Sequence, residues 1–192
     1  VAVTGVQTCA LPISWSLDYP SGPQIWRATA TGETRLLKAF SANDEVPRAA
    51  LTPAPGGAFY GILPREALSG NGLLYRITID GTFDVLHTFT GGTDGYPAQI
   101  RLGLDGNTYV PHGTSVLVIR PDGTIVPNAF APPGILLAVD ATGTAYGVDS
   151  RCQPVCEIGL SRRQPNGTVD WLQSLATGIF YADASEIGRA HV

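Results

Sequence analysis

An internal repeat is the feature of this chain that most constrains its fold. A β-rich run, a glycine turn and a second β-rich run recur in IWRATATGETRLLKAF (25–40), LYRITIDGTFDVLHTF (74–89), VLVIRPDGTIVPNAF (116–130) and, less closely, IGLSRRQPNGTVDWLQSL (158–175). The turn glycines of the four copies are Gly32, Gly81, Gly123 and Gly167. A period of about 45 residues indicates an array of similar supersecondary units rather than one irregular domain.

A second phrase follows each of the first three copies. It reads GGAFYG from Gly56, DGNTYV from Asp105 and TGTAYG from Thr142. Asp-Gly and Asn-Gly between apolar runs are strong hairpin signals, so each unit contains four short strands joined by tight turns. The sequence therefore predicts an all-β fold, a partial β-propeller of about three and a half four-stranded blades. A β-sandwich also has short strands, but it predicts no phrase repeated at a near-fixed period.

The blades are expected at about 24–70, 71–114, 115–156 and 157–185, the last one incomplete. The two ends of the chain lie outside this repeat. The codons for EIGRAHV (186–192) resemble a short-read sequencing adapter, and those for VTGVQTCALPIS (3–14) contain its reverse complement. We expect residues 1–14 and 186–192 to be adapter-derived artefacts, as fusion scars are, and residues 15–185 to be a propeller fragment that is not functional alone.

The charge and the apolar runs of the chain argue against two kinds of partner, nucleic acid and the membrane interior. The net charge is −4 and charged residues make up 15% of the chain, so there is no basic footprint for nucleic acid. No apolar run approaches the roughly 18 residues that a membrane-spanning helix needs. We expect neither nucleic-acid binding nor membrane insertion by these residues.

The acidic residues of the repeat are interpreted as turn residues. Aspartate before glycine in a hairpin tolerates left-handed backbone and accepts hydrogen bonds from its own turn. The residues assigned to this structural role are Gly32, Asp80, Gly81, Asp105, Gly106, Asp122, Gly123, Asn166 and Gly167. No catalytic residue, cofactor or metal ligand is assigned, and enzymatic activity is not the favoured expectation.

Two pairs of residues have alternative interpretations. Cys152 and Cys156, in RCQPVC, could form a disulfide in an exported protein or remain free thiols, whereas a metal site would need further ligands. His87 and His112 could act as base and acid in a lyase. They occupy different places in the repeat, however, and are expected to be surface or rim residues.

The second copy carries a family resemblance. The segment LLYRITIDGTFDVLHTFTGGTDGYPAQIRLGLDGNTYVP (73–111) resembles the GloVer tandem repeat of choice-of-anchor bacterial proteins. The matching positions are Leu74, Tyr75, Ile77, Gly81, Leu86, Phe89, Gly91 or Gly92, Asp94, Gly95, Pro97, Leu102, Asp105, Gly106 and Tyr109. The resemblance implies an extracellular or surface-attached β-propeller and carries over no catalytic residue. The PDGT turn is also similar to those of six-bladed propellers that include lactonases and streptogramin lyases.

The expected function is a non-catalytic, extracellular or cell-surface binding module without a cofactor. Its ligand or protein partner is expected at blade-connecting loops, such as the one that contains GGTDGYP (91–97). The alternative is a propeller enzyme of the lactonase or streptogramin-lyase type, acting on a small molecule in the central channel.

Overall fold

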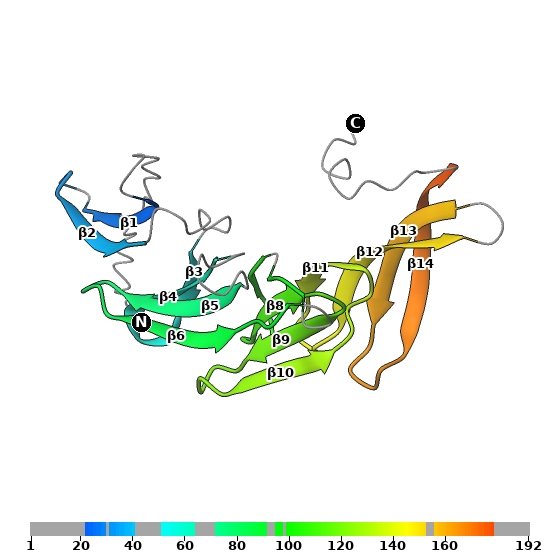
Figure 1. Ribbon diagram of the computed structural model, residues 1–192. Coiled ribbons are helices and arrows are strands. Elements are labelled where there is room, and N and C mark those ends of the chain that lie inside the picture. Colours follow the sequence, from blue (N-terminus) through cyan, green and yellow to red (C-terminus); the bar gives the residue numbers. More distant parts are fainter. Residues whose placement is uncertain are drawn as a thin grey trace. The chain divides into compact units, whose positions relative to one another are not determined.

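The computed structural model describes residues 22–29, 31–40, 51–63, 72–91, 95–97, 99–152 and 156–178, the last three without their side chains (Figure 1). The segments expected to derive from adapter DNA, 1–14 and 186–192, lie outside the described residues. The chain divides into two units, one of Val1–Leu102 with Gly106–Ala131 and the other of Gly103–Asp105 with Pro132–Val192.

The first unit contains three antiparallel sheets. They are made of β1 (Gln24–Ala28) and β2 (Thr34–Ala39); of β3 (Thr52–Ala54), β4 (Ala58–Leu63), β5 (Leu73–Thr78) and β6 (Phe83–Thr88); and of β7 (Arg101–Leu102), β8 (Thr108–His112), β9 (Ser115–Ile119) and β10 (Ile125–Phe130). A short 3-10 turn, Pro55–Gly57, joins β3 to β4.

The second unit is a single sheet. Its strands are β11 (Ile135–Val139), β12 (Ala145–Cys152), β13 (Cys156–Arg163) and β14 (Val169–Gly178). In every four-stranded sheet the strands lie side by side in chain order, as Figure 1 shows for β3–β6. A succession of antiparallel four-stranded meanders is the construction of a β-propeller, so the chain is all-β and forms a partial β-propeller. Among the described residues no helix is long and apolar enough to cross a bilayer.

The sheets begin at a different point of the repeat from the one expected. β3 and β4 pair with β5 and β6, so their sheet crosses the boundary placed between 24–70 and 71–114. The sheets β7–β10 and β11–β14 cross the next two expected boundaries in the same way. A repeat defines the period of a fold but not the residue at which each sheet starts. The pairing of Leu63 with Leu73, two apolar strand residues, joins the end of one sequence copy to the start of the next.

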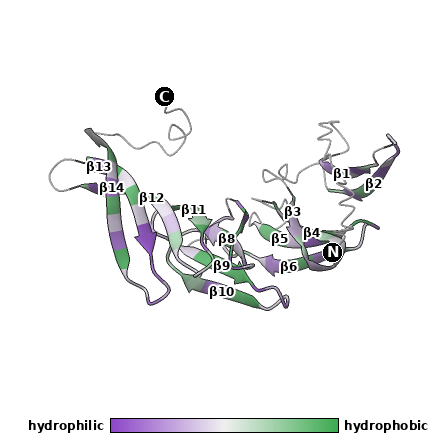
Figure 2. Ribbon diagram, turned by 180° about the vertical axis from the view of Figure 1, so that it is seen from behind, coloured by the Kyte–Doolittle hydropathy of each residue, from purple (hydrophilic) through white to green (hydrophobic). Residues whose placement is uncertain are grey.

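The core of the first unit lies on both faces of the sheet β3–β6. On one face Ile62 and Leu74 belong to a buried cluster whose other members are Tyr60, Phe89, Ile100, Val110, Leu117 and Ile119. On the other face Leu63, Tyr75 and Ile77 pack with Ile25, Phe40 and Leu73. Strands between two sheets are hydrophobic on both faces, which Figure 2 shows as hydrophobic runs along strands such as β9. Phe40 and Phe89, which end the first and second copies of the repeat, lie in these clusters.

The glycine turns lie at one end of each sheet, which we call the turn end. We call the opposite end of each sheet the loop end. Gly32, Gly81, Gly123 and Gly167 all have φ between 85° and 95°, a conformation that a Cβ atom disfavours. The same backbone hydrogen bonds recur in these turns; in the second copy the Gly81 amide donates to the Thr78 carbonyl at 3.0 Å. Each meander thus has its glycine turn at one rim, with the same backbone hydrogen bonds in every copy.

Candidate functional site

The aspartates of the turns bind their own backbone. The Asp122 carboxylate accepts a hydrogen bond from the Thr124 amide at 2.8 Å, and Asp80 accepts one from the Thr82 amide at 3.2 Å and another from the Thr78 hydroxyl. In the fourth copy the Asn166 side chain accepts from the Thr168 amide at 2.9 Å. These contacts satisfy backbone donors that a two-residue turn leaves open, which is the structural role assigned from sequence.

Asp140 has the same role, and sequence reasoning missed it. Its carboxylate accepts from the amides of Thr142 and Thr144, at 2.8 and 3.0 Å, and from the Tyr146 hydroxyl at 3.1 Å. The signal was present, since the TGTAYG phrase directly follows Asp140 and Ala141.

Hydrogen bonds within the turns lower the pKa of Asp80, Asp122 and Asp140. The Thr78 hydroxyl is the largest cause for Asp80, the Thr124 amide for Asp122 and the Thr142 hydroxyl for Asp140. A carboxyl group that serves as a general acid near neutral pH needs a raised pKa, so these groups are poorly suited to that work. Within the described part of the chain no three residues among His, Cys, Asp and Glu are placed to hold a metal ion.

The two histidines converge on one phenylalanine. The ring centroid of Phe89 lies 4.8 Å from that of His87, on β6, and 5.0 Å from that of His112, at the end of β8. His112 is buried, with 2% of its surface exposed, so of the two expected positions, surface or rim, the surface one is wrong for this residue. Sequence position could not reveal the convergence, because the two rings come from neighbouring sheets and meet only through packing between the sheets.

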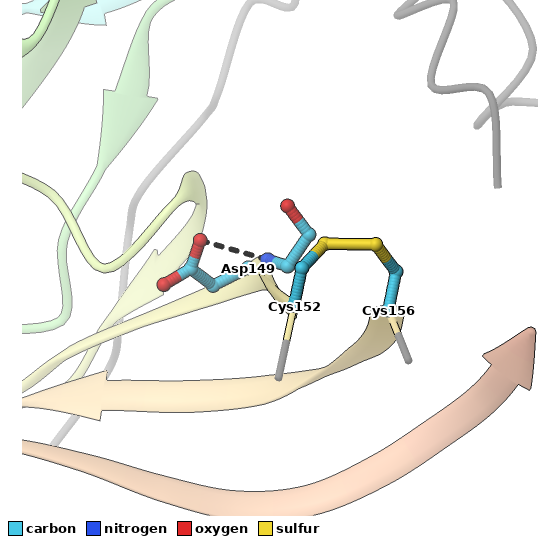
Figure 3. The surroundings of a disulfide bond; sticks show 4 residues. Asp149, Cys152 and Cys156 are labelled. Carbon is cyan, nitrogen blue, oxygen red and sulfur yellow. Dashed lines mark hydrogen bonds between the residues drawn. A yellow bond between two sulfur atoms is a disulfide. The ribbon is translucent and has the colours of Figure 1, made fainter. Parts of the chain in front are cut away.

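A disulfide closes the loop end of the β12–β13 hairpin. Cys152 and Cys156 are register partners with Cα atoms 3.9 Å apart, and their sulfur atoms are bonded (Figure 3). Next to them, Arg151 donates to the Glu157 carboxylate at 2.8 and 3.0 Å. The guanidinium of Arg151 also lies over the Trp171 ring, 4.3 Å from its centroid. The ring is covered on this side by Arg151 and packs against Gly159 on the sheet, so it is not an open platform for a ligand.

A pocket of about 180 Å³ opens between the sheets β3–β6 and β7–β10 at their turn ends. Its lining residues are Pro55, Tyr60, Arg76, Leu86, Ile119, Pro121, Asp122 and Gly123. Tyr60 and Arg76 are register partners on β4 and β5, so their side chains leave the sheet on the same face. Burial raises the pKa of Tyr60, and the nearby Arg76 cation opposes that shift. The pocket therefore presents a protonated hydroxyl beside a guanidinium.

Sequence patterns within one copy of the repeat do not indicate this pocket. Tyr60 belongs to the phrase GGAFYG, which predicts a strand, and Arg76 aligns with Arg27 and Arg162 of the first and fourth copies. Their proximity depends on the pairing of β4 with β5 across two sequence copies, which the expected blade ranges separated.

The similarity of this chain to known proteins concerns its fold and not its activity. No protein-family model matches the chain, and no curated protein matches it. Among solved structures, one assigned as a gluconolactonase is 17% identical with a TM-score of 0.50, covering 81% of this chain and 58% of its own. A puromycin-hydrolyzing peptidase from Mycobacterium tuberculosis is 18% identical with a TM-score of 0.51, covering 80% of this chain and 24% of its own.

A catalytically inactive virginiamycin B lyase from Staphylococcus aureus is also similar, at 19% identity and a TM-score of 0.43 over 80% of this chain and 49% of the lyase. The chain thus spans about half the length of the lyase and of the gluconolactonase. The likeness to the gluconolactonase and to the peptidase supports the fold alone and assigns no activity.

Proposed function

We propose that this chain is part of a non-catalytic β-propeller module that binds a small ligand, with further contacts to a partner through its blade-connecting loops. The observation that carries the proposal is the pocket beside Tyr60 and Arg76. Tyr60 lines this pocket, and only 4% of the residue is exposed. A hydroxyl and a guanidinium that line the same pocket offer a ligand two kinds of hydrogen-bond donor.

The turn carboxylates support a binding role over a catalytic one. Asp80, Asp122 and Asp140 are engaged by their own turns, and hydrogen bonds lower the pKa of each. A side chain held by its turn and kept ionised can stabilise the scaffold, but it is not positioned to transfer a proton to a substrate.

The disulfide supports an extracellular or cell-surface location. Disulfides persist in oxidising compartments and are rare in the cytosol. The Cys152–Cys156 bond closes a small hairpin on an exposed part of its sheet, where a cytosolic reductant would reach it. Assignment to the GloVer repeat is part of the same proposal, and the recurring glycine turns support it.

Turnover and binding can be separated in one experiment. The full chain is titrated with a panel of small acids, amides, sugars and lactones by isothermal titration calorimetry, and the same mixtures are followed for product by NMR. We expect saturable heat from part of the panel with no product formed. Product above the protein-free background would contradict a non-catalytic role.

A propeller enzyme of the lactonase or streptogramin-lyase type is the second candidate. The specific observation in its favour is that His87 and His112 approach the same Phe89 ring, which brings two potential proton-transfer groups to the loop end of neighbouring sheets. This candidate requires that turnover, if found, disappears in His112→Gln. Loss in a variant that still melts cooperatively would favour the enzyme over the binding module.

A further inference from the structure

We propose that the pocket between the sheets β3–β6 and β7–β10 binds a small monocarboxylate with a short apolar tail. This inference rests on the proposed binding function and names its ligand class. The site is built from Arg76 and Tyr60 as donors and from Pro55, Leu86 and Ile119 as apolar walls.

The donors of Arg76 exceed its acceptors in the protein. Its Nη2 donates to the Pro55 carbonyl at 3.4 Å, and its Nη1 lies 3.8 Å from the Asp84 carboxylate. Both distances are longer than the roughly 2.7–2.9 Å of a strong charge-assisted hydrogen bond. A guanidinium carries five N–H donors in a planar fork, so most of them remain available to an anion. The side chain of Arg76 is nevertheless only 30% exposed, which strengthens its attraction for a negative charge.

Tyr60 adds a neutral donor next to this cation. It pairs with Arg76 across β4 and β5. Its hydroxyl is protonated at neutral pH, since the ordinary pKa of a tyrosine is 10.0 and burial raises the pKa of Tyr60 further. Arg76 and Tyr60 together offer a carboxylate a charged donor and a hydroxyl donor within one pocket.

The rest of the pocket restricts the charge and size of the ligand. The carboxylate of Asp122, which its turn keeps ionised, stands among the lining residues and disfavours a multiply charged anion such as phosphate. The volume of about 180 Å³ is enough for a chain of a few carbons. Pro55, Leu86, Ile119 and Pro121 provide apolar contact for that chain.

The test uses the full chain and butyrate as the probe, with butyramide as a neutral molecule of the same shape and inorganic phosphate as a more highly charged anion. In ¹H–¹⁵N NMR titrations we expect saturable shifts with butyrate, centred on the amides of Leu86 and Gly123. Butyramide should bind at least about tenfold more weakly, because a charge-assisted hydrogen bond is replaced by a neutral one. Butyramide binding as tightly as butyrate, or tighter binding of phosphate, would overturn the ligand class.

Variants locate the binding. Arg76→Gln is expected to weaken butyrate binding at least about tenfold, Tyr60→Phe by a smaller factor, and Arg76→Lys by an intermediate one because it keeps the charge and loses the fork. Arg101→Gln, which removes an exposed arginine of β7 outside the pocket, is the matched control and should bind like the parent chain. Thermal melts establish that each variant is folded. Unchanged affinity in folded Arg76→Gln and Arg76→Lys would refute the site.

The ligand class and the binding function fail in different ways. If butyrate leaves Leu86 and Gly123 unperturbed while another member of the ligand panel binds, the carboxylate inference is wrong and the binding role stands. If butyrate binds as described but the chain turns over a lactone or ester, the pocket stands and the non-catalytic role is wrong.

Discussion

The ring of Tyr75 on β5 covers Gly61, its register partner on β4, so closely that a Cβ atom at Gly61 would overlap the ring. Tyr75 is fully buried and packs against Phe40 and Phe83 of the cluster between the sheets β1–β2 and β3–β6, with ring centroids 6.0 and 4.9 Å away. A glycine within a strand often marks such a close approach. The contact between these two sheets therefore depends on the missing side chain at Gly61.

Gly61→Ala should destabilise the protein by about 1–3 kcal/mol, because the added methyl group forces the buried ring out of its position. The measurement is the free energy of unfolding from urea titration. In a double-mutant cycle, Tyr75→Leu should relieve most of the added penalty, since the smaller side chain leaves room for the methyl group. Strictly additive effects of the two substitutions would show that the clash does not determine the loss.

Tyr75→Phe should leave stability unchanged or raise it by up to about 1 kcal/mol. The Tyr75 hydroxyl is buried, and among the described residues it has no hydrogen-bond partner, so removing it removes an uncompensated desolvation cost. Tyr146→Phe is the contrasting variant, because its hydroxyl donates to Asp140 at 3.1 Å, and it should destabilise. Loss of stability in Tyr75→Phe, measured by the same urea titration, would mean that the hydroxyl has a partner.

Acid should destabilise the turn ends. The folded-state pKa of Asp80, Asp122 and Asp140 lies below the ordinary value of 3.8, so their stabilisation is complete above that pH and is lost as pH falls through the lowered values. We expect the melting temperature to be level from about pH 7 to 5 and to fall below about pH 4. Asp122→Asn should reduce the acid-induced fall without a loss at neutral pH, because Asn166 already fills the equivalent turn position in the fourth copy. A melting curve that is independent of pH down to about 2.5 would contradict this account.

Much of the fold could be predicted from the repeat, because its signals are local. A turn that needs positive φ selects glycine, so Gly32, Gly81, Gly123 and Gly167 mark hairpins wherever they stand. The alternation of strand and turn then predicts four-stranded sheets. The residue at which each sheet begins is not determined by local sequence, because it depends on whether β4 pairs with β5 or is the last strand of a sheet. The expected blade boundaries were wrong at these places.

The pocket beside Tyr60 and Arg76 could not be predicted from the sequence either, because it too depends on contacts that are not local. Tyr60 and Arg76 meet through pairing between two sequence copies, and Ile119 and Pro121 reach them only through packing between two sheets. His87 and His112 likewise meet at Phe89 from different sheets. The sequence pattern within one copy of the repeat predicts its turns. The pocket and the histidine pair arise from contacts between neighbouring copies, which the pattern of one copy does not show.

Asn128 lies in the irregular part of β10, and substitutions there test its backbone conformation. It is the one residue other than glycine with a positive φ, 52°, within the segments that the structure describes, and it lies where the pairing of β10 with β9 shifts register. Because its side chain is exposed, Asn128→Ala should cost about 1 kcal/mol through backbone strain alone. Asn128→Gly, the matched control, should not lose stability in this way, since glycine adopts positive φ freely. Equal urea midpoints for the alanine and glycine variants would contradict a left-handed residue at this position.

The Cys152–Cys156 disulfide should contribute about 2 kcal/mol, a small value for such a bond, because the loop that it closes is short and loop-closure entropy grows with loop length. We expect dithiothreitol to lower the midpoint of urea unfolding modestly in the parent chain. The double variant Cys152→Ser with Cys156→Ser should start at that lower midpoint and be insensitive to the reductant.

Reduction should also weaken the contact of Arg151 with Trp171, since both cysteines border the Arg151–Glu157 pair, and tryptophan fluorescence reports that change. A parent chain whose midpoint is the same with and without dithiothreitol, and which reacts with thiol reagents before reduction, would show that the two cysteines are free thiols.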